Sequence, residues 1–210
     1  MEVKGSEKMK SVVLAYELIG SAFIMISINW GAYMQKGQFG PICVGATLFA
    51  DIVIFGPISG GHFNPAVTFG VLVREGRKKL RKNCIYLLQI VVAQCLGAFL
   101  GCWIAFYATV HDDHHVMRTF VLCPNFRKSN EDPCDYSNNT GVYGKVFMIE
   151  MIVTFIYISY SLSGIYNRIG ESITVNALGV GICLVCLITV SGGLTGACLN
   201  PYFGLVQTIY

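Results

Sequence analysis

The last 39 residues of the 210-residue chain, 172–210, contain no charged side chain. A single helix of this length would extend about 58 Å, roughly twice the hydrocarbon thickness of a bilayer. We therefore expect one membrane span ending at Val190, a turn at 191–193, and a second helix opened by Asn200-Pro201. Asn is a favoured N-cap, and Pro suits the first helical turn. A helix that begins at membrane depth is tolerated only inside protein or beside a polar cavity, so this segment indicates a pore.

The same arrangement occurs earlier in the chain. Residues 59–65 (SGGHFNP) match residues 195–201 (TGACLNP) when the Asn-Pro pairs are aligned. Glu17 and Glu150 precede these two segments at similar distances within related sequences. Paired apolar segments interrupted by Gly and Pro in two repeats are typical of a transport pathway at a repeat interface.

Composition and charge place the chain in a membrane. Apolar residues make up 54% of the chain and charged residues only 13%, too few to cover a soluble globule of this size. Apolar runs predict spans at about 11–34, 42–57, 83–110, 146–166 and 173–190. We treat residues 1–210 as one channel domain, with repeat one at about 11–110 and repeat two at about 145–210. Because repeat one contains three spans, repeat two is expected to be inverted across the membrane.

The positions of the basic residues predict the orientation. Six of the nine residues in 74–82 are Lys or Arg, so this loop and the basic N-terminus are expected to face the cytoplasm. The net charge of +3 is thus a topological signal, with membrane lipid as the implied partner and no reason to invoke nucleic acid. The hydrophilic segment 111–144 is then outside, where Asn138 would be a possible glycosylation acceptor and Cys123 and Cys134 could pair.

Two facing helix N-termini would give the pore its chemistry. Each presents free backbone N–H groups and the positive end of a helix dipole, which repel cations. If the side-chain oxygens of Asn64 and Asn200 cap their own helices, their amide N–H groups are left to donate into the channel. A water held by its oxygen from two sides conducts protons poorly, whereas neutral solutes can pass.

The segment from Ser59 to Thr68 resembles the first signature of the aquaporin, or major intrinsic protein, family. The resemblance covers nearly the whole chain, including the Glu17, Glu150 and Asn200-Pro201 motifs. It implies an all-α membrane fold of six spans, built as an inverted repeat with two re-entrant half-helices. It also implies a homotetramer with one pore per subunit, passage of water or small uncharged solutes, and no cofactor.

The second signature departs from the family pattern. The first motif reads Asn64-Pro65-Ala66, but the second reads Asn200-Pro201-Tyr202, so the side chain of Tyr202 must displace a neighbour or swing aside. Phe203 stands where the family usually has the filter Arg. Counting from the motifs places the remaining filter positions at Val44, Ile188 and Ala197, which gives an apolar wall.

Two further expectations follow from the departures. Under an alternative alignment with a two-residue deletion, Phe203-Gly204 corresponds to a later Phe-Gly pair of the family, and the Arg is absent either way. Nine residues follow Pro201, so the last transmembrane helix is expected to be missing from this chain. A filter of this kind would be less strict about charge and less efficient for water.

Several polar residues in apolar segments have competing interpretations. For Glu17 and Glu150 a structural role, accepting hydrogen bonds from the backbone that leads into the half-helices, is favoured over a proton path. Gln94 is expected to hydrogen-bond loop backbone, and no role is assigned to Asp51. His62 is expected at the inner vestibule, and Cys198 within reach of pore-blocking mercurials. The cluster at 111–115 (HDDHH) matches no standard metal site, so no metal is expected.

We infer a channel for water, small neutral solutes, or both. A glycerol-type facilitator is one alternative, and a non-conducting membrane scaffold or assembly subunit is another. No phosphate loop, nucleophile elbow or metalloprotease helix is present in the sequence, so an enzyme is the least favoured class.

Overall fold

The computed structural model describes residues 7–33, 39–109, 140–166 and 172–209. These residues form seven α-helices: α1 (Glu7–Tyr33), α2 (Gly40–Ser59), α3 (Pro65–Glu75), α4 (Arg77–Thr109), α5 (Thr140–Tyr166), α6 (Ile173–Thr195) and α7 (Pro201–Ile209). Five of them, α1, α2, α4, α5 and α6, are long and apolar enough to cross a membrane. The described part of the chain is therefore an all-helical membrane protein, as the sequence predicts.

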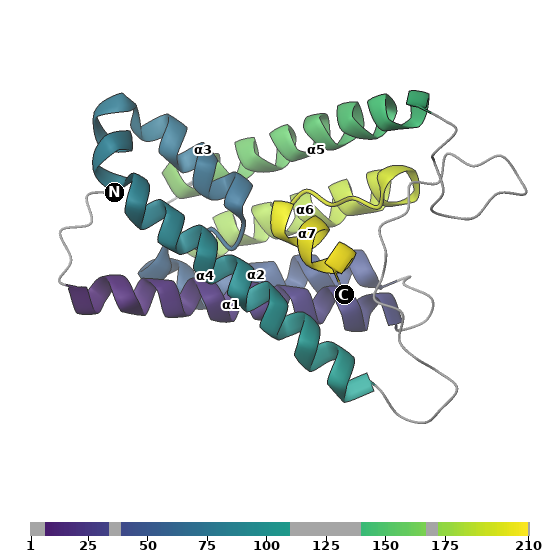
Figure 1. Cartoon of the computed structure of the whole chain (residues 1–210), viewed down its shortest axis with the longest axis horizontal. Coiled ribbons are helices and arrows are strands. Elements are labelled where there is room, and N and C mark those ends of the chain that lie inside the picture. Colours follow the sequence, from purple (N-terminus) through teal and green to yellow (C-terminus); the bar gives the residue numbers. More distant parts are fainter. Residues whose placement is uncertain (1–6, 34–38, 110–139, 167–171, 210) are drawn as a thin grey trace, which may run out of the picture.

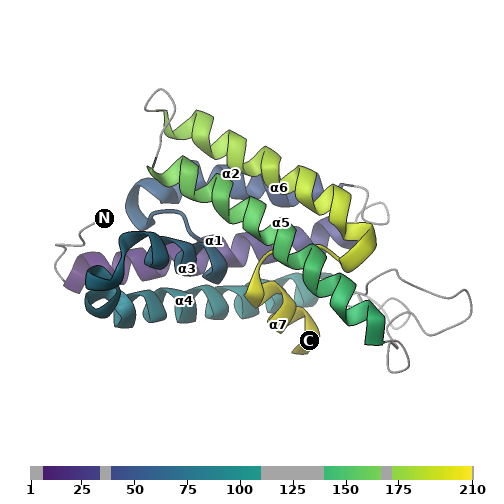
Figure 2. The same ribbon diagram turned by 90° about the horizontal axis from the view of Figure 1, so that it is seen from above.

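The two short helices start in the middle of the molecule. Figure 1 shows α3 and α7 beginning close together and running toward opposite ends of the long axis, along which the spanning helices lie. The starts of α1 and α4 and the end of α5 lie at one end of the molecule. The ends of α1, α4 and α6 lie at the other. Figure 2 shows α3 and α7 held between the long helices.

The end of α6 differs from the sequence-based expectation. The span predicted to stop at Val190 continues to Thr195, so the predicted turn at 191–193 is helical. The helix breaks at Gly196, which has a left-handed φ of 91° and donates its N–H to the carbonyl of Gly192. Inside a bilayer, backbone groups must be satisfied within the chain, and this requirement outweighs the weak helix propensity of Gly192 and Gly193.

Small residues allow the spanning helices to approach closely. An added Cβ at Gly97 or Gly101 of α4 would overlap a backbone carbonyl oxygen of α1. An added Cβ at Gly45 of α2 would meet Gly181 of α6, and one at Gly181 would meet Gly45. Such contacts between small residues are the usual means by which helices associate in membranes, where lipid removes the hydrophobic drive.

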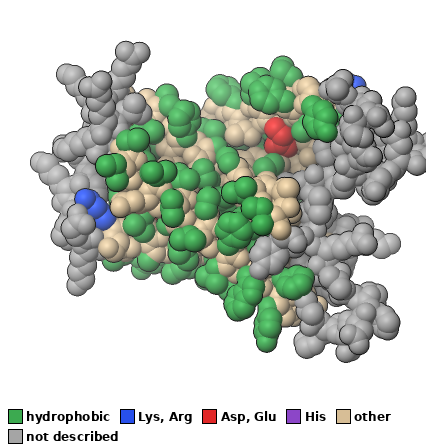
Figure 3. Space-filling model, viewed as in Figure 1, with side chains coloured by type: hydrophobic (Ala, Val, Ile, Leu, Met, Phe, Trp, Pro, Cys, Tyr) green, Lys and Arg blue, Asp and Glu red, His purple; other side chains and the backbone are tan. Residues whose placement is uncertain are grey.

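The outer surface is apolar over most of its length. Figure 3 shows hydrophobic side chains spread over the middle of one face, with the visible Lys and Arg side chains toward the ends of the long axis. Phe147 and Phe155 of α5 and Ile85 and Leu88 of α4 are all strongly exposed. In water such a surface would aggregate, so it fits contact with lipid or with another membrane subunit.

Candidate functional site: a pore between two helix starts

The first helix start is capped as the sequence predicts. The Oδ1 atom of Asn64 accepts the backbone N–H of Ala66 at 2.8 Å, and Pro65 opens α3. The second start differs, because the buried Oδ1 of Asn200 has no hydrogen-bond partner among the described residues. The expectation that both Asn oxygens cap their own helices is therefore wrong for Asn200. By analogy with Asn64, the backbone N–H that this oxygen would accept belongs to Tyr202. The side chain of Tyr202 is held by a hydrogen bond to the carbonyl oxygen of Phe63.

Reciprocal hydrogen bonds join the two helix starts. The Nδ2 atom of Asn64 donates to the carbonyl oxygen of Leu199 at 3.1 Å, and Nδ2 of Asn200 donates to the carbonyl oxygen of Phe63 at 3.1 Å. Each amide thus binds the residue that precedes the other Asn. Because an amide nitrogen carries two hydrogens, one N–H of each side chain is not used by these bonds.

The backbone before each Asn has the same conformation in both repeats. The φ angles of Gly60 and Gly196 are 96° and 91°, and those of Phe63 and Leu199 are 44° and 45°. Ala197, which aligns with Gly61, also has a positive φ of 54°. A left-handed conformation costs a non-Gly residue about 1–3 kcal/mol and persists only where the surroundings enforce it. Both repeats therefore aim their Asn side chains by the same backbone path.

Two glutamates, Glu17, which is buried, and Glu150, which is half-buried, hold these strained segments. Glu17 accepts the backbone N–H of His62 at 3.0 Å and that of Phe63 at 2.8 Å. Glu150 accepts the N–H of Cys198 at 3.1 Å and that of Leu199 at 3.2 Å. These are the contacts that the sequence predicts for the structural role of the two carboxylates. Thr195 adds a hydroxyl hydrogen bond to Glu150.

A polar network lies behind α3. The Nε2 atom of Gln94 donates to Glu17 at 2.8 Å and to the hydroxyl of Thr68 at 3.1 Å. Gln94 therefore contacts side chains, and the expected bond to loop backbone is not found among the described residues. The Nδ1 atom of His62 lies 3.2 Å from the same Thr68 hydroxyl. This network fixes the His62 ring beside the strained segment.

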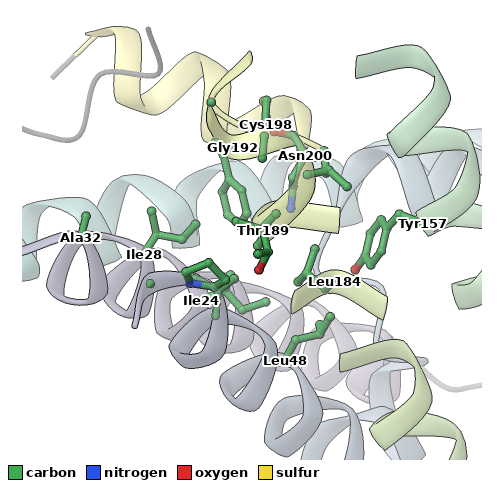
Figure 4. A pocket seen from close by; sticks show the side chains of 18 of the residues that line it. Ile24, Ile28, Ala32, Leu48, Tyr157, Leu184, Thr189, Gly192, Cys198 and Asn200 are labelled. Carbon is green, nitrogen blue, oxygen red and sulfur yellow. Dashed lines mark hydrogen bonds between the residues drawn. The ribbon is translucent and has the colours of Figure 1, made fainter. Parts of the chain in front are cut away.

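A cavity of about 310 Å³ adjoins both motif asparagines (Figure 4). We call it the Asn cavity. Its wall includes all four residues that the sequence assigns to the filter, Val44, Ile188, Ala197 and Phe203, as well as Cys198. Gly192 and Gly193 also line it, and an added Cβ on either would meet no atom within 4 Å. The missing side chains of these two glycines help to keep the cavity open.

A second cavity of about 300 Å³ lies toward the end of the molecule where α5 ends and α6 begins. We call it the His cavity, because His62 lines it together with Gly60 and Gly61 of the strained loop. Tyr166 lines its wall and packs under the guanidinium of Arg74, 4.3 Å from the ring centroid. The Asn cavity thus adjoins both helix starts, whereas the His cavity approaches the loop before α3 from the opposite end of the molecule.

Comparisons with known proteins agree with this architecture. A model of the family described as "Major intrinsic protein" matches residues 5–208. The chain belongs to the major intrinsic protein family. It is 28% identical to glycerol uptake facilitator protein-like 6 of Lactiplantibacillus plantarum, over 92% of this chain and 82% of that protein. It is 30% identical to mouse (Mus musculus) aquaporin-5, over 93% of this chain and 64% of that protein.

The fold also matches a solved member of the family. The X-ray structure of the aquaglyceroporin from Plasmodium falciparum superposes with a TM-score of 0.66 at 20% sequence identity. The match covers 95% of this chain and 80% of that one. At this identity the likeness establishes the fold alone.

Tyr202, the residue that departs from the usual motif of the major intrinsic protein family, does not line the Asn cavity. Its ring is buried and packs edge-on against Phe203, with the ring centroids 4.6 Å apart. Its hydroxyl donates to the carbonyl oxygen of Phe63 at 2.6 Å. The side chain therefore swings aside, one of the two outcomes that the sequence allowed, and adds a second link between the two helix starts.

Sequence reasoning missed several cavity-lining residues, among them two with polar side chains, Tyr157 and Gln207. Tyr157 lines both cavities, and Gln207 of α7 lines the Asn cavity. Tyr157 follows Glu150 by two helical turns, so helical periodicity alone would have placed it on the same inward face. Gln207 lies two turns after Asn200 and could have been found in the same way.

Some predicted features lie outside the described residues. These are the glycosylation acceptor Asn138, the possible Cys123–Cys134 pair and the His-Asp cluster at 111–115. Asp51, which the sequence leaves without a role, is buried, and its Oδ2 has no partner among the described residues.

Proposed function

We propose that this protein is a membrane channel for small uncharged solutes, with a path through the Asn cavity and the His cavity. The reciprocal hydrogen bonds of Asn64 and Asn200 carry this proposal. They hold two helix N-termini at one point beside a cavity and leave one amide N–H on each side chain to donate to a solute. The positive ends of both helix dipoles meet there and oppose the passage of cations.

Among small uncharged solutes, we propose that water passes with low efficiency. The filter wall of Val44, Ile188, Ala197 and Phe203 offers no side-chain hydrogen bond to replace the hydration of a solute. Glycerol-type solutes are the second candidate. The lining of the Asn cavity favours them, because it combines large apolar surfaces with a few polar side chains, Asn64, Asn200, Thr189 and Gln207. A polyol can place its hydrocarbon backbone against the apolar surfaces and its hydroxyl groups against the polar side chains.

We further propose an orientation and an assembly. The basic residues from Arg74 to Lys82, at the end of α3 and the start of α4, favour a cytoplasmic position for this end of the molecule and for the N-terminus. The exposed apolar faces of α4 and α5 support contact with lipid and with other subunits in a homotetramer. Cross-linking in native membrane extracts would measure the subunit number.

Light scattering by vesicles containing the purified full-length protein tests the proposed function. We expect water or glycerol permeability above that of protein-free vesicles, and a loss of about tenfold or more in Asn64→Asp. Aspartate can still cap α3 through an oxygen, but it lacks the amide donors and carries a negative charge. Phe155→Leu, on the exposed face of α5, is the matched control and should not change permeability. If the wild-type protein conducts neither solute, the non-conducting scaffold replaces the channel.

A further inference from the structure

The Asn cavity and the His cavity have one lining residue in common among the described residues, and it is Tyr157. The side chain of Tyr157 is 3% exposed and packs into the main buried cluster. Figure 4 shows its ring extending from α5 toward Leu184 of α6, at the inner end of the Asn cavity. Tyr157 is thus placed between two spaces of nearly equal size.

The lining residues of α2 and α6 place the boundary between the two cavities at the depth of Tyr157. On α2, Leu48 lines the Asn cavity, and Ile52, one helical turn later, lines the His cavity. On α6, Leu184 lines the Asn cavity, and Val180, one turn earlier, lines the His cavity. The change from one cavity to the other therefore occurs within one turn on each helix, and Tyr157 of α5 reaches into this layer.

We propose that the ring of Tyr157 is the partition that separates the two cavities and limits the rate and the solute size of the channel. This inference rests on the proposed conduction. A solute that leaves the Asn cavity has to displace this ring before it enters the His cavity. Permeation is then limited on α5 by the ring of Tyr157, beyond the Asn pair, as well as by the four filter positions.

The partition acts by steric exclusion, so two substitutions of Tyr157 should have different effects. Tyr157→Phe retains the ring and should conduct like the wild-type protein. Tyr157→Ala removes the ring and leaves space for water, whose share of the liquid volume is about 30 Å³ per molecule. The rest of the wall on both sides would be unchanged.

Stopped-flow measurements on vesicles with equal amounts of protein test the proposal. We expect Tyr157→Ala to raise water permeability by about fivefold or more and to raise glycerol permeability as well. Tyr160→Ala is the matched control, because Tyr160 lies on the same helix with its side chain exposed. Equal permeabilities of the wild-type, Tyr157→Phe and Tyr157→Ala proteins would overturn the proposal. Size-exclusion chromatography verifies that each variant remains monodisperse.

A second measurement does not depend on conduction. Cys198 lines the Asn cavity and serves as a natural probe of access in a protein whose other cysteines are replaced by alanine. A small membrane-impermeant thiol reagent, 2-sulfonatoethyl methanethiosulfonate, is applied to one side of the vesicles at a time, and mass spectrometry measures the modification of Cys198. In the proteins with Tyr157 or with Tyr157→Phe, we expect Cys198 to react only from the side of the Asn cavity. In Tyr157→Ala, Cys198 should react from both sides.

The two measurements separate the two proposals. If the wild-type and Tyr157→Phe proteins do not conduct but Tyr157→Ala opens Cys198 to both sides, the channel function of the wild-type protein fails and the partition stands. If the wild-type protein conducts and Cys198 already reacts from both sides, the channel function stands and the partition fails. Reaction from one side in all three proteins, with unchanged permeability, would also overturn the partition.

Discussion

The hydroxyl of Tyr202 donates to the carbonyl oxygen of Phe63 at 2.6 Å, across 139 residues of sequence. The same carbonyl accepts Nδ2 of Asn200 at 3.1 Å. Both acceptor positions of this oxygen are therefore occupied from within the protein, whereas the carbonyl of Leu199 in the other repeat accepts Nδ2 of Asn64. The large residue at the third position of the motif thus makes the two helix starts unequal.

Removing the Tyr202 hydroxyl should weaken this link without emptying the space. We expect Tyr202→Phe to lower the free energy of unfolding by about 0.5–1.5 kcal/mol, the net value of a typical hydrogen bond. Tyr202→Ala should cost more, about 3–5 kcal/mol, because it also leaves a cavity in the core. Thermal unfolding in detergent measures the difference. Equal stability of the two variants would contradict the packing described for the ring.

Glu17→Gln and Glu150→Gln should each destabilise the fold. A carboxylate accepts two backbone N–H groups here, but a glutamine offers one oxygen and turns an NH₂ group toward the second donor. An unsatisfied buried donor costs about 1–3 kcal/mol. The expected readout is a lower yield of folded protein and a lower unfolding temperature. If either variant folds normally but alters proton flux in vesicles loaded with a pH-sensitive dye, the proton-path interpretation is supported instead.

The proposed apolar filter predicts the effect of a positive charge at position 203. Phe203 lines the Asn cavity, and Phe203→Arg would supply hydrogen-bond donors that the wall of Val44, Ile188 and Ala197 lacks. We expect Phe203→Arg to change water permeability by about threefold or more and to reduce glycerol permeability. Phe203→Leu, which keeps the wall apolar, is the control. Fast water flux in the wild-type protein that is unaffected by Phe203→Arg would rule out a limiting filter here.

Mercurials should block the channel through Cys198. This thiol lines the Asn cavity, with Sγ 3.1 Å from the carbonyl oxygen of Asn200. A bound mercury atom would fill the cavity beside the motif. We expect Cys198→Ser to abolish inhibition of solute flux by mercury chloride, whereas Cys186→Ser, at an exposed site on α6, should remain sensitive. Full mercury sensitivity of Cys198→Ser would exclude this site.

Asp51 is the buried carboxyl group without a partner at Oδ2 among the described residues. Burying a charged carboxylate oxygen without a partner is unfavourable, whereas the amide of Asn has nearly the same size and carries no charge. We expect Asp51→Asn to keep the fold and to raise the free energy of unfolding by about 1–3 kcal/mol. Chemical denaturation in mixed micelles can measure this change. A loss of stability would show that the carboxyl group has a stabilising contact.

The amino-acid sequence by itself determined the five membrane spans and the correspondence between the two half-helices. Uninterrupted apolar runs set the five spans, because a bilayer admits only backbone whose hydrogen bonds are satisfied internally. Two Asn-Pro pairs in matched contexts set the half-helices, and the two preceding glutamates indicated how the irregular segments are held. These features depend on local patterns and on internal repetition, both of which can be read along the chain.

Tertiary structure alone decided how side chains meet across the repeats. Helix α6 continues through Gly192 and Gly193 to Thr195 because its backbone hydrogen bonds remain satisfied, although these glycines predicted a turn. The contact of Tyr202 with Phe63 and the position of Tyr157 between two cavities both join segments that are distant in the sequence. Such contacts depend on the relative depth and rotation of packed helices, and neither residue periodicity nor motif spacing specifies these quantities.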